Sequence, residues 1–103
     1  MQFLIVARDR PDADARIKRA KARAEHMRLL HQLKGDGNIH DAGAILSDQG
    51  EIVGSMIIAS FPDRASLDAY ISVEAFKRDG VWDDIDILPF RTVNWAMRPP
   101  END

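Results

Sequence analysis

The sequence predicts a single α+β domain of the ferredoxin-like kind, with the element order β-α-β-β-α-β. Three observations lead to this prediction. The chain has 103 residues and 45% apolar content, which is enough for one hydrophobic core. Short apolar runs alternate with two segments of helical periodicity. A glycine-containing turn joins the two middle apolar runs, as in a β-hairpin.

The first apolar run covers residues 3–7 and predicts a strand that is apolar on both faces. Because side chains alternate along a strand, Phe3 and Ile5 point to one face, and Leu4 and Val6 point to the other. In so small a domain, helices can cover one of these faces. A partner subunit is the simplest cover for the second face.

Residues 14–34 have the periodicity of a long amphipathic helix. Asp12 or Asp14 is expected to cap its N-terminus, and Gly35 and Gly37 are expected to end it. We interpret its basic residues, among them Arg16, Lys18, Arg19, Lys21 and Arg28, as a solvated face. The expected buried stripe consists of Ile17, Ala20, Ala24, Met27, Leu30 and Leu33.

Two further strands follow, over residues 39–46 and 51–61, joined by a hairpin turn at 47–50. The strand at 51–61 is the most apolar of the chain, which is typical of a central strand. Proline and an acidic cap at 62–64 open a second helix, whose inward side carries Leu67, Tyr70 and Ile71. Residues 72–80 are expected to be irregular or briefly helical.

The last strand is expected over residues 84–95, where Pro89 favours an edge position because proline cannot donate a ladder hydrogen bond. We expect the folded domain to cover 1–97 and a mobile polar tail to follow at 98–103. Right-handed crossovers then place the first and third strands in the centre and the second and fourth at the edges. The helices cover one sheet face, and the open face predicts a homodimer.

Composition excludes several classes of function. Charged residues make up 30% of the chain, the net charge is -3, and the signs are interspersed, so no basic surface for nucleic acid is indicated. The sequence has no cysteine, which excludes disulfides and thiolate metal sites. No apolar run approaches the roughly 20 residues needed to span a bilayer. We therefore expect a cytoplasmic protein that binds neither nucleic acid nor membrane.

Several short motifs occur together in a specific order. Arg23-Ala-Glu-His26-Met lies on the first helix, and Gly54-Ser55 opens an apolar strand that ends in Ala-Ser-Phe. Val73-Glu74-Ala75-Phe76 is followed by Gly-Val-Trp, and Leu-Pro-Phe lies on the last strand. This series resembles the YciI-like (YCII-related) family of the dimeric α+β barrel group. The chain departs from the family pattern at Glu74-Ala75, where the family has Asp-Pro, and at Ala44, where it has proline.

The resemblance implies a ferredoxin-like homodimer in which a histidine and a carboxylate face one cleft. Some members of the family look like cofactor-free dehydrochlorinases or isomerases that act on aromatic breakdown products. Carried over to this chain, the pair is His26 and Glu74. The resemblance therefore implies a fold more firmly than a substrate.

A carboxylate bonded to one nitrogen of His26 would fix the tautomer and raise the basicity of the ring. The other nitrogen could then move protons near neutral pH. On this hypothesis His26 and Glu74 are catalytic, and Ser55 orients a substrate oxygen. The alternative is a buried histidine that a carboxylate satisfies for structural reasons alone.

Three further residues are candidates for substrate binding. Arg23 could hold an anionic group through its guanidinium fork, or could pair with Glu25, Asp36 or a carboxylate of a partner subunit. Phe76 and Trp82 could line an apolar pocket between subunits, or belong only to the core. We expect Trp95 in the core or in an interface.

His31 and His40 are weaker candidates for chemistry. The spacing of His26, His40, Asp41 and Glu74 matches no tight zinc motif, so no metal is expected. We also expect no cofactor.

These observations support two main hypotheses about function. The first is a cofactor-free acid/base enzyme, an isomerase or dehydrochlorinase, acting on a small aromatic-derived or lactone-like acid. The second is a non-catalytic homodimeric module that binds a small ligand or a partner protein. A third hypothesis is a monooxygenase of the same fold group that uses oxygen or haem. The sequence contains no distinctive haem signature.

Overall fold

The computed structural model describes residues 1–97, and the tail expected at 98–103 lies outside the described residues. The element order follows the prediction, and the segment at 72–80 that was expected to be irregular or briefly helical contains a short helix. The elements are β1 (Gln2–Asp9), α1 (Ala13–Gly35), β2 (Ile39–Leu46), β3 (Ile52–Ser60), α2 (Arg64–Val73), α3 (Ala75–Arg78) and β4 (Trp82–Phe90).

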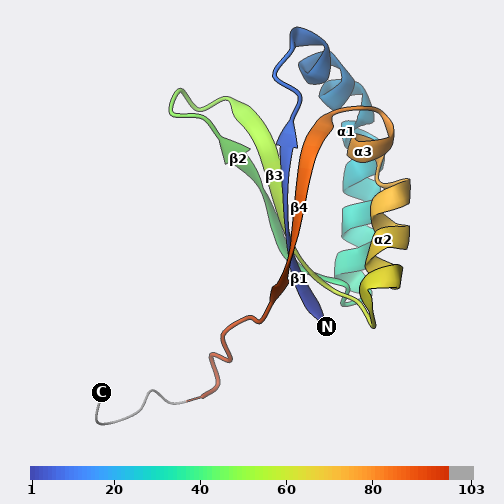
Figure 1. Cartoon of the computed structure of the whole chain (residues 1–103), viewed down its shortest axis with the longest axis vertical. Coiled ribbons are helices and arrows are strands. Elements are labelled where there is room, and N and C mark those ends of the chain that lie inside the picture. Colours follow the sequence, from blue (N-terminus) through green and yellow to red (C-terminus); the bar gives the residue numbers. More distant parts are fainter. Residues whose placement is uncertain (98–103) are drawn as a thin grey trace.

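The strands form one antiparallel sheet of four strands in the order β2-β3-β1-β4. The central positions of the first and third strands and the edge positions of the other two are therefore confirmed. The helices lie on one side of the sheet (Figure 1). The predicted α+β ferredoxin-like fold is confirmed as well.

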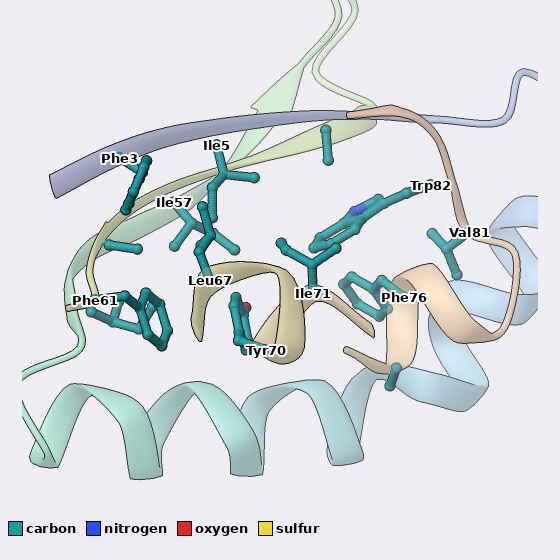
Figure 2. Close-up of a cluster of buried hydrophobic side chains, with 14 of the residues drawn as sticks. Phe3, Ile5, Ile57, Phe61, Leu67, Tyr70, Ile71, Phe76, Val81 and Trp82 are labelled. Atoms are coloured by element: carbon teal, nitrogen blue, oxygen red, sulfur yellow. The ribbon is translucent and has the colours of Figure 1, made fainter. Parts of the chain in front are cut away.

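The core lies between the sheet and the helices, as the alternation along β1 requires. Phe3 and Ile5 are buried on the helix side, whereas Leu4 and Val6 on the opposite face are only half-buried. From the other layer, Leu67, Tyr70 and Ile71 of α2 complete the core. Figure 2 shows these side chains between the sheet and α1.

The predicted buried stripe of α1 is wrong for half of its residues. Ile17 is 55% exposed, and Ala20 and Ala24 are also exposed. Met27, Leu30 and Leu33 are half-buried, as expected of stripe members at the edge of a core. The helix is rotated so that its buried face carries Ala15, Ala22 and His26, with Leu29 and Leu33 packed against the core.

Local signals set both ends of α1. Asp12, one of the two expected caps, accepts a hydrogen bond of 2.9 Å from the backbone N–H of Ala15. At the other end Gly37 has a φ of +83°, and its N–H donates to the carbonyl of Lys34 at 3.2 Å. The N–H of Asn38 reaches the carbonyl of Leu33 at 2.8 Å, which completes a Schellman motif.

The last strand ends at Phe90, five residues before the predicted end. The reason is the length of its neighbour: Phe90 pairs with Gln2, the first residue of β1, so no partner strand exists beyond it. Trp95 is 88% exposed, so its predicted place in the core is wrong. Pro89 lies on an edge strand, as expected.

None of the helices within residues 1–97 has the length and apolar character that a membrane crossing requires.

Candidate functional site

The centre of the candidate site is a hydrogen-bonded pair between His26 of α1 and Glu74 at the junction of α2 and α3. His26 is 6% exposed and Glu74 is 0% exposed. The Nδ1 atom of His26 contacts Oε1 of Glu74. Glu74 is the N-cap residue of α3, and its side chain accepts a hydrogen bond from the backbone N–H of Phe76. The predicted pair therefore forms, and the extra methylene of Glu relative to Asp still allows the contact.

Three donors converge on the Glu74 carboxylate. Besides His26, the hydroxyl of Tyr70 donates to Oε2 at 2.9 Å, and the backbone N–H of Phe76 donates to Oε1 at 3.3 Å. Burial, together with the neighbouring Glu74 carboxylate, raises the pKa of Tyr70 well above its usual range, so this hydroxyl stays protonated. Because the Tyr70 hydroxyl and the Phe76 N–H both donate to this carboxylate, we assign the Nδ1 proton to His26, so that Nδ1 donates to Oε1 as well.

The second ring nitrogen of His26, Nε2, remains available for a hydrogen bond. No side chain or backbone group among residues 1–97 hydrogen bonds to Nε2. Every fully buried side-chain nitrogen or oxygen in the same part of the chain has a partner, so Nε2 is reached by solvent. With Nδ1 carrying the proton, Nε2 presents a lone pair and can accept a proton.

Aromatic packing holds the imidazole plane. The ring of Phe76 stacks on His26 with centroids 3.8 Å apart and an interplanar angle of 14°. Trp82 meets the His26 ring edge-on, with centroids 6.2 Å apart. The ring is therefore oriented by a hydrogen bond along one edge and by packing on its face, as a proton-transfer group needs.

His26 borders a pocket of about 400 Å³ between α1 and strands β2 and β3. Small side chains on the edge strand leave this space, because Ala42 and Ala44 pair with Ile57 and Ser55 and so share their sheet face. The sequence-predicted residues Arg23, Ser55 and Phe76 border the same pocket. Further lining residues are Arg19, Met27, Leu30, His31, Lys34, Ile39 and Asp41.

The rim of the pocket is mainly cationic. Arg23, His31 and Lys34 lie along one flank of α1, and Asp41 is the acidic residue among the lining side chains. Arg23 forms no ion pair within residues 1–97. Glu25, which we had considered as its partner, instead binds Arg78 at 2.8 and 2.5 Å, and these bonds lower the pKa of Glu25. Arg23 is thus available to an anionic group in the pocket.

Sequence reasoning missed Arg19, which we had assigned to a solvated face. Its guanidinium bonds Asp9 at 2.8 and 3.0 Å and reaches Oγ of Ser55 at 3.0 Å. The side chain of Arg19 is only 16% exposed. A signal was present: Arg19 lies seven residues before His26, so both project from the same side of the helix.

Trp82, which was a candidate either for a pocket or for the core, does not border this pocket. It is 3% exposed and lies behind Ser55, to which its indole N–H donates at 3.3 Å. His40 does not line the pocket, and it contacts Gln2 at 3.3 Å. Among the residues that the structure describes, no His, Asp and Glu side chains gather as a metal site would require.

The fold and the site define a class of protein: a small ferredoxin-like α+β domain that presents an oriented histidine at the wall of an open pocket. Within this class, the chain belongs to the YCII-related domain family, whose sequence model matches residues 1–91. The resemblance stated from the motifs is thereby confirmed.

A comparison with solved structures supports the fold. The chain is similar to 5-chloro-2-hydroxyhydroquinone dehydrochlorinase from Burkholderia phenoliruptrix, solved in complex with 2,5-dihydroxybenzoquinone. The TM-score is 0.76 at 23% identity, over 88% of this chain and 94% of that chain. No curated protein sequence matches the chain.

Proposed function

We propose that this protein is a cofactor-free acid/base enzyme that carries out elimination or isomerisation on a small, aromatic-derived or lactone-like acid. His26 acts through Nε2 as the base and later as the acid, and Glu74 orients it. One observation carries the proposal: the buried Glu74 carboxylate binds Nδ1 of His26, while Nε2 is open to a pocket. A histidine that served only the core would be sealed on both sides.

The lining of the pocket supports a small acid as substrate. Arg23 and Lys34 supply charge at the rim, and Met27, Leu30 and Ile57 supply apolar surface within it. A volume of about 400 Å³ is in the range of small-molecule sites. The similar dehydrochlorinase favours elimination and a halogenated hydroxyhydroquinone as the first substrate to test.

The proposed elimination needs only the substrate, His26 and water to account for its protons and electron pairs. Nε2 of His26 takes a proton from a hydroxyl of the substrate's keto tautomer, in which the chlorine-bearing carbon is tetrahedral, or from an acidic carbon next to that carbon. The electrons of the broken bond form a new π bond, and chloride leaves with the electron pair of its C–Cl bond. The imidazolium then returns the proton to water, so the net change is loss of HCl. Such general base catalysis contributes about 10²–10⁴ in rate.

A substrate panel with a matched histidine control tests the proposal. Chlorinated hydroxyhydroquinones and lactone acids are assayed by chloride release and absorbance, with wild type, His26→Asn and His40→Asn. We expect turnover to fall by about 10²–10⁴ in His26→Asn and to be unchanged in His40→Asn, because His40 lies outside the pocket.

Two results would contradict the proposal. In the first, folded His26→Asn protein, verified by circular dichroism, turns over every substrate as fast as wild type. In the second, wild type binds members of the panel in its pocket but converts none of them, which would favour the non-catalytic binding module.

A further inference from the structure

The hydroxyl of Ser55 has an unusual set of neighbours. Its oxygen accepts one hydrogen bond from Nη2 of Arg19 at 3.0 Å and a second from Nε1 of Trp82 at 3.3 Å. Ser55 is 5% exposed, and what remains accessible borders the pocket beside His26. The two donors come from α1 and β4, whereas the serine lies on β3.

The hydrogen bonds already made by the Ser55 hydroxyl determine what it can offer to a ligand. A guanidinium and an indole N–H are donors only, so neither can receive the proton of Ser55. A hydroxyl oxygen has two lone pairs, and both are used by Arg19 and Trp82. Ser55 can therefore offer a ligand only its O–H. No acceptor among residues 1–97 takes this proton, and the ligand-accessible side of Ser55 is the pocket.

Arg19 is held rigidly in this role. Asp9 binds its guanidinium at two points, and the guanidinium lies 4.5 Å from the ring centre of Phe76. His26 lies 3.8 Å from the same ring centre. Arg19 and His26 therefore both pack against the ring of Phe76. The same aromatic ring helps to hold the donor system and the proposed base.

We propose that Ser55 is a dedicated hydrogen-bond donor to an anionic substrate oxygen of the phenolate or enolate type, with Arg19 and Trp82 as its positioning residues. Its part in turnover rests on the function proposed above: when His26 removes a proton, negative charge develops on a substrate oxygen, and a preoriented donor stabilises that charge. The nearby Arg19 charge polarises the hydroxyl and strengthens the bond.

Binding of two ligands of nearly equal shape tests this role without any turnover. At a pH where the phenol is ionised, 4-nitrophenolate can accept the Ser55 proton, whereas 4-nitroaniline presents N–H groups to a hydroxyl that has no lone pair left. We measure the dissociation constants of both by absorbance titration and compare their ratio. Both ligands report on the same folded fraction, so the ratio is unaffected by partial unfolding of a variant.

The expected results distinguish the serine from a matched control. Wild type prefers the phenolate, and Ser55→Ala lowers that preference by about tenfold or more, because a hydrogen bond to a charged group is lost. Ser60→Ala, on the same strand but outside the pocket lining, leaves the preference unchanged. An unchanged ratio in Ser55→Ala, or a wild type that binds neither ligand, overturns the inference.

Trp82→Phe tests the positioning role, because it removes the indole N–H that donates to Ser55 but keeps an aromatic ring beside His26 and Phe76. The loss of one donor frees a lone pair, so we expect the phenolate preference to fall by about threefold. In the Ser55→Ala background the same change has no further effect on the ratio. If Trp82→Phe lowers the phenolate preference as much in the Ser55→Ala background as in wild type, Trp82 does not act through the serine and the positioning role is contradicted.

Two outcomes distinguish failure of the donor role of Ser55 from failure of the enzyme proposal. A phenolate preference that depends on Ser55, without turnover of any substrate, overturns only the enzyme proposal. Turnover that depends on His26, with a preference that Ser55→Ala leaves intact, overturns only the donor role.

Discussion

At the scale of single residues, Glu74 links the fold to the proposed chemistry. It is fully buried, and it holds His26, the hydroxyl of Tyr70 and the N–H of Phe76 through one carboxylate. A buried carboxylate is costly unless donors surround it, and here three do. The same bonds that satisfy Glu74 leave only Nε2 of His26 for a substrate.

Replacing Glu74 with Gln should destabilise the protein. The amide brings two N–H groups into a site whose neighbours are donors, so at least one buried donor loses its acceptor. We expect the free energy of unfolding in urea to fall by about 2–4 kcal/mol. Glu25→Gln is the control, since Glu25 is a surface residue. Equal losses in both variants would contradict this account.

At the scale of secondary structure elements, β3 and β1 approach unusually closely at Gly54, the residue before Ser55. A Cβ at Gly54 would clash with the backbone carbonyl oxygen of Ala7 on the neighbouring strand. Glycine is therefore required here by the distance between strands, and its φ is not the reason. The carbonyl of Gly54 also accepts a hydrogen bond from Arg19 at 3.4 Å, next to the contact of Arg19 with Ser55.

Gly54→Ala should therefore be destabilising, by about 1–3 kcal/mol, because the two backbones must separate to admit the methyl group. Gly43→Ala is a matched control on the adjacent strand, where an added Cβ meets no atom within 4 Å. Urea denaturation measures both variants. A Gly54→Ala protein as stable as Gly43→Ala would show that the sheet accommodates the methyl group freely.

The N-terminus of α2 makes stability depend on pH. Asp63 caps this helix by accepting from the N–H of Ser66 at 2.8 Å, and this bond lowers the pKa of Asp63. Because the folded pKa lies below the unfolded one, the contribution is present above the unfolded value of about 3.9. It is lost as the pH falls through the folded pKa.

Asp63→Asn keeps a capping side chain but does not titrate. We expect wild type to melt at a higher temperature than Asp63→Asn at about pH 6, and the difference to vanish by about pH 2. Thermal melts followed by circular dichroism measure it. A difference that stays constant over this range would contradict the role of the ionised cap.

At the scale of the whole molecule, the sheet leaves one apolar face uncovered by helices (Figure 1). Leu4, Ile58 and Leu88 are directly paired neighbours across three strands, so they share this face. Leu88 is 50% exposed. Contiguous apolar surface of this kind marks an interaction site. We propose that two copies pack through it as a homodimer.

Sedimentation equilibrium tests the homodimer. We expect twice the chain mass of 11.6 kDa at micromolar concentration. Leu88→Glu should give monomer, because a charge would be buried in the apolar interface. Ile17→Glu should remain dimeric, since Ile17 is similarly exposed, at 55%, but lies on α1 in the helix layer. Wild-type protein that sediments as a stable monomer would contradict the proposal.

The element order and the sheet order were predictable because their signals are local. Alternation in β1, the capping residue Asp12, the glycine at 37 and Pro89 on an edge strand each act through neighbouring residues. The motif resemblance added the pairing of His26 with Glu74, which lie 48 residues apart and show no common periodicity.

The sequence by itself thus determined the fold class, the element order and the candidate base. The tertiary structure alone decided the rotation of α1, the end of β4 at Phe90 and the meeting of Arg19, Ser55 and Trp82. The physical reason is that these features depend on long-range contacts. Alanines in a helix carry little information about which face is buried, a strand extends only as far as its partner, and a hydroxyl acquires its donors only when three elements pack together.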